Sequence, residues 1–119
     1  MFETVLLPMD ANPQALDTAV KALELVQGHD SCLVLLELLD LAPDPSLLER
    51  IKARIDQSGI TCQRLERGGE PLTVILDVAD ELNVDVIVMG TGGVSLNSDD
   101  GSTAARVIEL APCPVLVVP

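Results

Sequence analysis

The sequence predicts an α/β domain whose parallel sheet is covered by helices on both faces. Short segments rich in Val, Leu and Ile alternate with segments whose apolar residues recur every three or four positions, the spacing of a helix with one buried side. Strict alternation of strand and helix favours parallel strands joined by right-handed crossovers. With 119 residues, 48% of them hydrophobic, the chain has the size and apolar content expected of a single domain over residues 1–119.

Five segments are expected to form strands. Apart from the third, they are apolar almost throughout rather than at every second position, which is typical of strands buried on both faces. They cover residues 4–8, 32–39, 61–65, 85–89 and 115–118. Because Phe2 is the only aromatic residue, Val, Leu and Ile must fill the core.

Four helices are expected between these strands, each with one apolar stripe for the sheet. Their periodic apolar residues fall within 16–26, 47–55, 72–82 and 104–111. Three helices begin with a capping side chain and a proline, whose fixed φ suits the first helical position. These pairs are Asn12-Pro13, Asp44-Pro45 and, in a weaker form, Glu70-Pro71. Gly28 and Gly59 follow the first two helices, where a left-handed residue commonly ends a helix.

The composition argues against nucleic acid and membranes as partners. Nineteen acidic residues against seven basic ones give a formal charge of −12, which repels phosphodiester backbones and anionic lipid headgroups. No apolar run approaches the ~20 residues that span a bilayer, and the N-terminus lacks the basic residues of a signal peptide. We therefore expect a cytoplasmic protein.

The cysteines and the single histidine limit the chemistry. Cys32, Cys62 and Cys113 are odd in number and lack the spacing of zinc ligands, so we expect reduced, mostly buried thiols. His29 follows Gly28 in a polar turn and is expected to be solvated. With one histidine, no nucleophilic triad can be drawn, and weak nucleotide hydrolysis is the most activity that we expect.

Two segments at the carboxyl ends of expected strands are suited to bind a ligand, because ligands of open parallel sheets lie at this edge. One is Pro8-Met9-Asp10, and the other is Gly90-Thr91-Gly92-Gly93, which leads to Gly101-Ser102-Thr103 at the start of the last helix. Glycines let backbone N–H groups approach a ligand, and a helix N-terminus favours an anion. This layout suits a phosphate cradle or a plain turn. It is neither a Walker A loop nor a complete GxGxxG motif.

The most specific motifs lie in the C-terminal third: VIVMGT at 86–91, GSTAARV at 101–107 and APCPVLVV at 111–118. Together with VLLPMD at 5–10, they make the chain resemble the universal stress protein family over essentially its whole length. The resemblance implies a three-layer α/β/α fold of the adenine-nucleotide alpha-hydrolase-like type, with a five-stranded sheet of order 3-2-1-4-5. It also implies a homodimer formed through the last strand and, in one branch of the family, ATP bound where the strand order reverses.

By position in those motifs, the resemblance implies a site for an adenine nucleotide, ATP or AMP with Mg²⁺. Asp10 would hold the ribose or the adenine, and Pro8, Met9 and Met89 would flank the base. The phosphates would be cradled by Gly90, Gly93, Gly101, Ser102 and Thr103. The dimer edge would consist of Val115, Leu116, Val117 and Val118, an apolar strand that aggregates unless it is covered.

The sequence departs from the family's ATP-binding pattern, G-x2-G-x9-G-[ST]. Gly90 and Gly93 have the expected separation, but only seven residues separate Gly93 from Gly101. Basic residues are absent from this segment, and Asp99 and Asp100 precede the helix. A carboxylate about 6 Å from a phosphate charge, at an effective dielectric of about 20, costs roughly 3 kcal/mol. This exceeds the roughly 0.3 to 1 kcal/mol that a helix terminus contributes, so triphosphate binding is disfavoured.

The roles of four charged residues stay open from the sequence. Asp99 or Asp100 caps the last helix and points away from the site, or the two bind a Mg²⁺ carried by the nucleotide. Asp10 contacts a ligand or serves as a neighbour of the first helix. Arg106 is a surface charge or a phosphate ligand.

Three functions are consistent with these observations. The first is a small stress-response module of the universal stress protein type that dimerises and acts by binding, with or without nucleotide. The second is a true ATP-binding member with weak hydrolysis, which requires the shortened loop to close over phosphates. The third is a dimeric interaction scaffold that has lost any small ligand.

Overall fold

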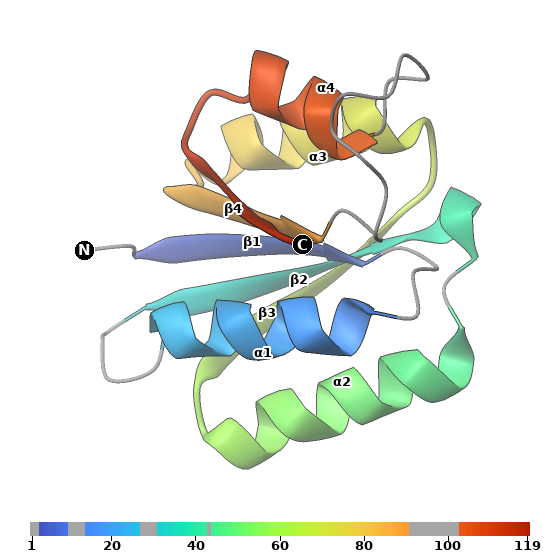
Figure 1. Ribbon diagram of the computed structural model, residues 1–119, viewed down its shortest axis with the longest axis vertical. Coiled ribbons are helices and arrows are strands. Elements are labelled where there is room, and N and C mark those ends of the chain that lie inside the picture. The colour runs from blue at the N-terminus through green and yellow to red at the C-terminus, as the bar shows by residue number, and fades with distance from the viewer. Residues whose placement is uncertain (1–2, 10–13, 27–30, 43, 91–102) are drawn as a thin grey trace.

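The computed structural model describes residues 3–9, 14–26, 31–42, 44–90 and 103–119. Five parallel strands form one sheet in the order β3-β2-β1-β4-β5, between two layers of helices (Figure 1). The strands are β1 (Thr4–Met9), β2 (Cys32–Leu38), β3 (Thr61–Arg67), β4 (Val86–Gly90) and β5 (Val115–Val118). The expected fold class, parallel pairing and 3-2-1-4-5 order are confirmed.

The helices are α1 (Ala15–Val26), α2 (Pro45–Ser58), α3 (Pro71–Glu81) and α4 (Thr103–Leu110), and a short 3-10 helix, η1 (Leu39–Leu41), follows β2. Helices α1 and α2 cover one face of the sheet, and α3 and α4 cover the other (Figure 1). Alternating side chains of the central strands therefore enter two aliphatic clusters. Val5 and Leu7 pack on the α1 and α2 side, whereas Leu6 packs on the α3 and α4 side.

Two helix starts follow the predicted capping chemistry. The carboxylate of Asp44 accepts a hydrogen bond from the N–H of Ser46 at 3.0 Å, and Pro45 is the first residue of α2. Glu70, the weaker candidate in sequence, accepts hydrogen bonds from the N–H groups of both Leu72 (3.2 Å) and Thr73 (2.9 Å). Its longer side chain still reaches the first turn of α3, so it caps this helix as fully as Asp44 caps α2.

The helix ends use residues in the left-handed region. Gly59, with φ of 72°, ends α2 as the sequence predicted. Asn83, with φ of 50°, follows α3, where the N–H of Val84 donates to the carbonyl of Ala79 at 3.0 Å. Asn12, Pro13 and Gly28, the remaining predicted helix signals, lie outside the described residues.

Some boundaries and burials differ from the expectation. The second strand ends at Leu38 because the chain turns into η1, and β3 continues to Arg67. The apolar pattern of 115–118 suggested a strand covered on both faces, yet β5 is half-exposed and Leu116 keeps 41% of its surface exposed. This expectation was wrong because β5 is the last strand of the sheet, where fewer elements pack against it.

The three cysteines are free thiols, as expected, but they are partly rather than mostly buried. Cys32 begins β2, Cys62 lies on the edge strand β3, and Cys113 precedes β5. Each of these positions lies at the end or the edge of a strand or just before one, and each thiol is partly exposed. In the described part of the chain, no helix has both the length and the apolar character to cross a membrane.

Candidate functional site

A pocket opens at the carboxyl ends of β1 and β4. These strands are neighbours in the sheet, with Val5 opposite Val86 and Leu6 opposite Ile87. Because β1 pairs with β2 on one side and with β4 on the other, the strand order reverses here, which is where parallel sheets bind ligands. The pocket encloses about 40 Å³, room for a few water molecules.

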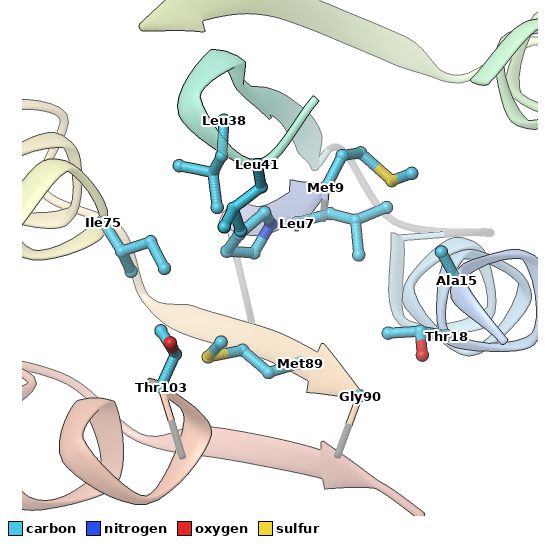
Figure 2. Close-up of a pocket in the computed structure, with 11 residues that line it drawn as sticks. Leu7, Met9, Ala15, Thr18, Leu38, Leu41, Ile75, Met89, Gly90 and Thr103 are labelled. Carbon is cyan, nitrogen blue, oxygen red and sulfur yellow. The ribbon is translucent and has the colours of Figure 1, made fainter. Parts of the chain in front are cut away.

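Seven structural elements supply its walls (Figure 2). Strand β1 contributes three residues, β4 two, α1 two, and the end of β2 with η1 another two, while α3 and α4 contribute one each. They are Leu7, Pro8, Met9, Met89, Gly90, Ala15, Thr18, Leu38, Leu41, Ile75 and Thr103. Residues almost a hundred positions apart thus share one cavity, because every crossover returns the chain to the same edge of the sheet.

Five of the predicted site residues line this pocket. They are Pro8, Met9, Met89, Gly90 and Thr103. The other predicted nucleotide contacts, Asp10, Gly93, Gly101 and Ser102, lie outside the described residues, as do the metal candidates Asp99 and Asp100. The structure therefore brings together the candidates for the base and the first residue of α4.

The pocket wall is mainly apolar. Met9 and Met89 line the pocket from adjacent strands, each is at least nine-tenths buried, and their side chains pack on opposite faces of the sheet. The polar groups that the wall offers include the hydroxyls of Thr18 and Thr103 (Figure 2). None of the described residues that line the pocket has an ionisable side chain. Such a wall can hold a flat apolar ring, but it supplies no general acid or base.

Sequence reasoning missed six of the lining residues. Ile75 was assigned to the core by the helical periodicity, and it lies in the cluster that ends at the pocket, whereas Thr18 is a polar residue that the periodicity did not include. Leu38 ends β2 and lay within the strand expected at 32–39, whereas Leu41 is the last residue of η1, an element that the sequence did not predict. The other two are Leu7 and Ala15. For the five apolar residues among them, no local signal separates a core residue from a pocket residue, since both kinds of position carry apolar side chains.

A buried ion pair lies beside the pocket. Glu37, at the end of β2, is 7% exposed, and its carboxylate lies 2.9 Å from the Nζ of Lys52 on α2. Glu37 is opposite Met9 in the pairing of β1 with β2. The pair ties α2 to the strand that leads into Leu38 and Leu41, two residues of the pocket wall.

Arg106 does not line the pocket. It lies on α4, one turn after Thr103, and is exposed. Hydrogen bonds from Thr73 and Leu72 lower the pKa of Glu70, and the positive charge of Arg106 adds a smaller lowering. Of the two roles that the sequence left open for Arg106, surface charge or phosphate ligand, these observations favour the surface charge, which acts on Glu70 at the start of α3.

Two of the three thiols lie in surroundings that disfavour their charged form. Burial raises the pKa of Cys62 and of Cys113, so both are poor thiolates at neutral pH. Among the residues that the structure describes, no three His, Cys, Asp or Glu side chains are grouped to hold a metal ion.

The edge of β5 is the other predicted functional surface. Val115, Val117 and Val118 are partly buried and Leu116 is exposed. Next to it, Leu25, Val86 and Pro114 complete an apolar groove of about 170 Å³ with Val115 and Leu116. Strand β5 pairs with β4 only, so the backbone of its outer edge has no strand partner in the described part of the chain.

Comparison with known proteins agrees with this architecture. The model of the Universal stress protein family matches residues 1–119. The curated Universal stress protein Sll1654 of Synechocystis is 40% identical over 136 aligned positions, which cover all of this chain and 87% of the relative. A universal stress protein of Thermus aquaticus is 31% identical and covers 99% of both chains. The alignments exceed 119 positions, so both relatives contain residues that this chain lacks.

Solved structures share the fold. A universal stress protein crystallised in complex with cAMP superposes with a TM-score of 0.81 and 21% identity, covering 99% of this chain and 97% of the other. At this identity, the likeness concerns the arrangement of helices and strands.

Proposed function

The chain belongs to the universal stress protein family, and we propose that it is a small cytoplasmic regulatory module that binds an adenine nucleotide between β1 and β4 and acts as a homodimer. In this proposal the protein responds to stress by changing its ligand or its partner, and it catalyses no reaction of its own.

The observation that carries the proposal is the position and the wall of the pocket. It lies where the strand order reverses, and Met9 and Met89 line it from adjacent strands. Methionine side chains are flexible and polarisable, so they adapt to the face of a planar base. The relative that was crystallised with cAMP has the same fold and supports an adenine compound as the ligand class.

The size of the pocket sets a condition on binding. About 40 Å³ is far less than a purine needs. A base therefore enters only if Met9 and Met89 change rotamers, or it lies across the mouth of the pocket with its edge inserted. Either mode places the rest of the ligand toward Gly90 and Thr103, where α4 begins.

A true ATP-binding member with weak hydrolysis is the alternative function. It would use Gly93, Gly101 and Ser102 for phosphates and Asp99 or Asp100 for Mg²⁺. The described pocket wall favours binding over hydrolysis, because it contains no side chain that could activate water. A ligand-free interaction scaffold is the third function, and it needs only the β5 edge.

Calorimetric titration with adenosine, AMP and ATP, with and without Mg²⁺, tests the proposal. We expect saturable binding of at least one of them, and we expect Met89→Ala to weaken it. Val88→Ala is the matched control, because Val88 is also buried on β4 but is not among the residues that line the pocket. If none of these compounds binds at millimolar concentration, the nucleotide site is rejected and the ligand-free interaction scaffold remains as the function. Steady release of phosphate from ATP would favour the alternative.

Dimerisation through β5 is supported by the exposed Leu116 and by the apolar groove beside it. Pairing of two β5 edges across a two-fold axis would cover both features and satisfy the unpaired backbone edge. Sedimentation at micromolar concentration would show twice the 12.6 kDa mass of one chain. A monomer alone under these conditions would reject this part of the proposal.

A further inference from the structure

Positive charge is concentrated in one part of the chain. Residues 45–67, which form α2, β3 and the turn between them, include five of the seven Lys and Arg residues but only three acidic ones, a net charge of +2. The rest of the chain carries −14. Strand β3 is the edge of the sheet opposite β5. An acidic partner therefore meets the least repulsion on the side of the molecule that α2 and β3 form.

Two arginines on α2 lack the carboxylate partner that other basic residues have. Four basic side chains form ion pairs: Lys21, Lys52, Arg64 and Arg67. Arg50 and Arg54 are exposed, and neither pairs with any residue that the structure describes. They lie one turn apart, where two like charges slightly destabilise a helix. Neither is in the last turn of α2, where the helix dipole favours a cation. Contacts within the fold therefore do not account for these two charges.

Arg54 also lines a groove of about 350 Å³ between α1 and α2, two helices that lie side by side on one face of the sheet (Figure 1). The second halves of both helices form its lining, which consists of Val20, Leu23, Glu24, Arg54, Gln57 and Ser58. Val20 and Leu23 supply apolar surface, and Arg54 and Gln57 supply hydrogen-bond donors. Arginine beside apolar side chains is typical of protein interfaces. The groove therefore has the chemistry of a docking surface for another protein.

Glu24 limits the kind of acidic partner that fits. It lines the same groove as Arg54, and its own ion-pair partner, Lys21, lies 3.6 Å away on the exposed side of α1. A nucleic acid carries closely spaced phosphates, and some of them would face the carboxylate of Glu24. A peptide can instead place carboxylates against the arginines and an uncharged residue against Glu24. The charge pattern therefore favours a protein partner over a nucleic acid.

We propose that the groove between α1 and α2, together with Arg50, docks an acidic segment of a partner protein. Two carboxylates about one helical turn apart would meet Arg50 and Arg54, since residues four positions apart on a helix are neighbours. A guanidinium group can donate two parallel hydrogen bonds to a carboxylate. This docking goes beyond nucleotide binding and does not depend on it, because the groove and the pocket share no residue.

A nuclear magnetic resonance titration of the whole chain with an acidic peptide tests the proposal, because it detects weak binding and locates it. The probe is an alanine-based helical peptide with glutamates at i and i+4, and the control peptide has glutamines there. We expect the glutamate peptide to shift the resonances of Arg50, Arg54 and Gln57. Its affinity should fall about tenfold or more between roughly 0.02 M and 0.5 M salt, because salt screens the attraction. The glutamine peptide should cause no shift.

The double variant Arg50→Gln with Arg54→Gln should lose about tenfold or more in affinity for the peptide, because both guanidinium donors are removed. Arg64→Gln with Arg67→Gln is the matched control, since it removes the same charge from β3, where both arginines already pair with carboxylates. The control should change the affinity by about twofold or less. The Arg50 and Arg54 variant should unfold at the same urea concentration as the parent protein.

Each of four results would overturn the proposal. The first is the absence of shifts on α2 at millimolar peptide. The second is an equal loss of affinity in the Arg64 and Arg67 variant, which would mean that net charge alone attracts the peptide. The third is a clear loss of stability in the Arg50 and Arg54 variant, which would mean that these arginines support the fold. The fourth is a single-stranded oligonucleotide that binds the two arginines of α2 more tightly than the peptide does. None of these results would reject the adenine site.

Discussion

The carboxylate of Glu37 and the ammonium of Lys52 lie 2.9 Å apart, with the side chain of Glu37 almost fully buried at the end of β2. An unpaired charge in such a place is costly, so the two side chains depend on each other. The pair also connects α2 to the strand that enters the pocket wall at Leu38.

Lys52→Met should destabilise the protein by about 2 to 4 kcal/mol, because it leaves the carboxylate of Glu37 buried without a partner. The double variant Glu37→Leu with Lys52→Met should recover most of this loss, since it replaces the pair by apolar side chains. Urea unfolding measures both. Lys21→Met is the control: its pair with Glu24 spans 3.6 Å, both side chains are more than half exposed, and it should cost less than about 0.5 kcal/mol. An equal effect of the two single variants would contradict this account.

Asp85→Asn should loosen the start of the central strand. One carboxylate oxygen of Asp85 accepts hydrogen bonds from the N–H groups of Glu3 and Thr4, each at 2.9 Å. The substitution weakens two charge-assisted bonds and should cost about 1 to 2 kcal/mol in the free energy of unfolding. Hydrogen exchange should rise first at Thr4. Asp80→Asn on the exposed side of α3 serves as the control, and a similar loss there would show that net charge, rather than this clamp, is responsible.

Stability at acid pH should depend on Glu70. Its pKa lies below the ordinary 4.5 because it accepts hydrogen bonds from Thr73 and Leu72. A lowered folded-state pKa stabilises the fold above the unfolded pKa, and this contribution is lost as the pH falls through the folded value. Glu70→Gln should therefore flatten the fall in stability below about pH 4.5.

Thr73→Val removes only the hydroxyl donor to Glu70 and should flatten the same curve partially. Thermal unfolding between pH 3 and 7, about the range where carboxylates titrate, measures both variants. An unchanged slope in Glu70→Gln would rule out this carboxylate as a source of acid sensitivity.

Two of the thiols should react slowly with a disulfide reagent at pH 8, which lies below the ordinary thiol pKa of about 8.5. Burial raises the pKa of Cys62 and Cys113, which reduces their thiolate fractions. In urea, both should react at the rate of a free thiol. Cys113→Ala and Cys62→Ala assign the slow phases, and native rates equal to those in urea would mean that these thiols are open to solvent.

Leu116→Lys should convert the proposed dimer to a monomer, because it places a charge on the apolar edge strand. Leu110→Lys is a matched control, since Leu110 is even more exposed, at 53%, but lies on α4 rather than on β5. Sedimentation distinguishes the two. If only Leu110→Lys abolishes the dimer, the interface lies on α4 rather than on β5.

Much of the fold was predictable from local patterns. The starts of α2 and α3 follow from Asp44-Pro45 and Glu70-Pro71, and the end of α2 follows from Gly59. These signals work because caps and turns depend on neighbours within a few residues. The order of the strands did not come from such patterns; it was implied by the family resemblance.

The candidate site was predictable in part. The sequence motifs identified Pro8, Met9, Met89, Gly90 and Thr103, which line one pocket in the structure. They did not identify Leu41 or Ile75, because an apolar residue in a turn or on a helix has the same pattern whether it closes the core or opens onto a cavity.

The sequence by itself determined the alternation of strands and helices, the aliphatic core and the acidic charge, all of which follow from side-chain type and short-range spacing. Only the tertiary structure decided that Glu37 is buried against Lys52, that Leu116 is exposed on β5, and that no basic side chain among the seven lines the pocket. These are relations between residues far apart in the chain. They depend on which strands pair and on which face each helix packs, and no local pattern encodes that choice.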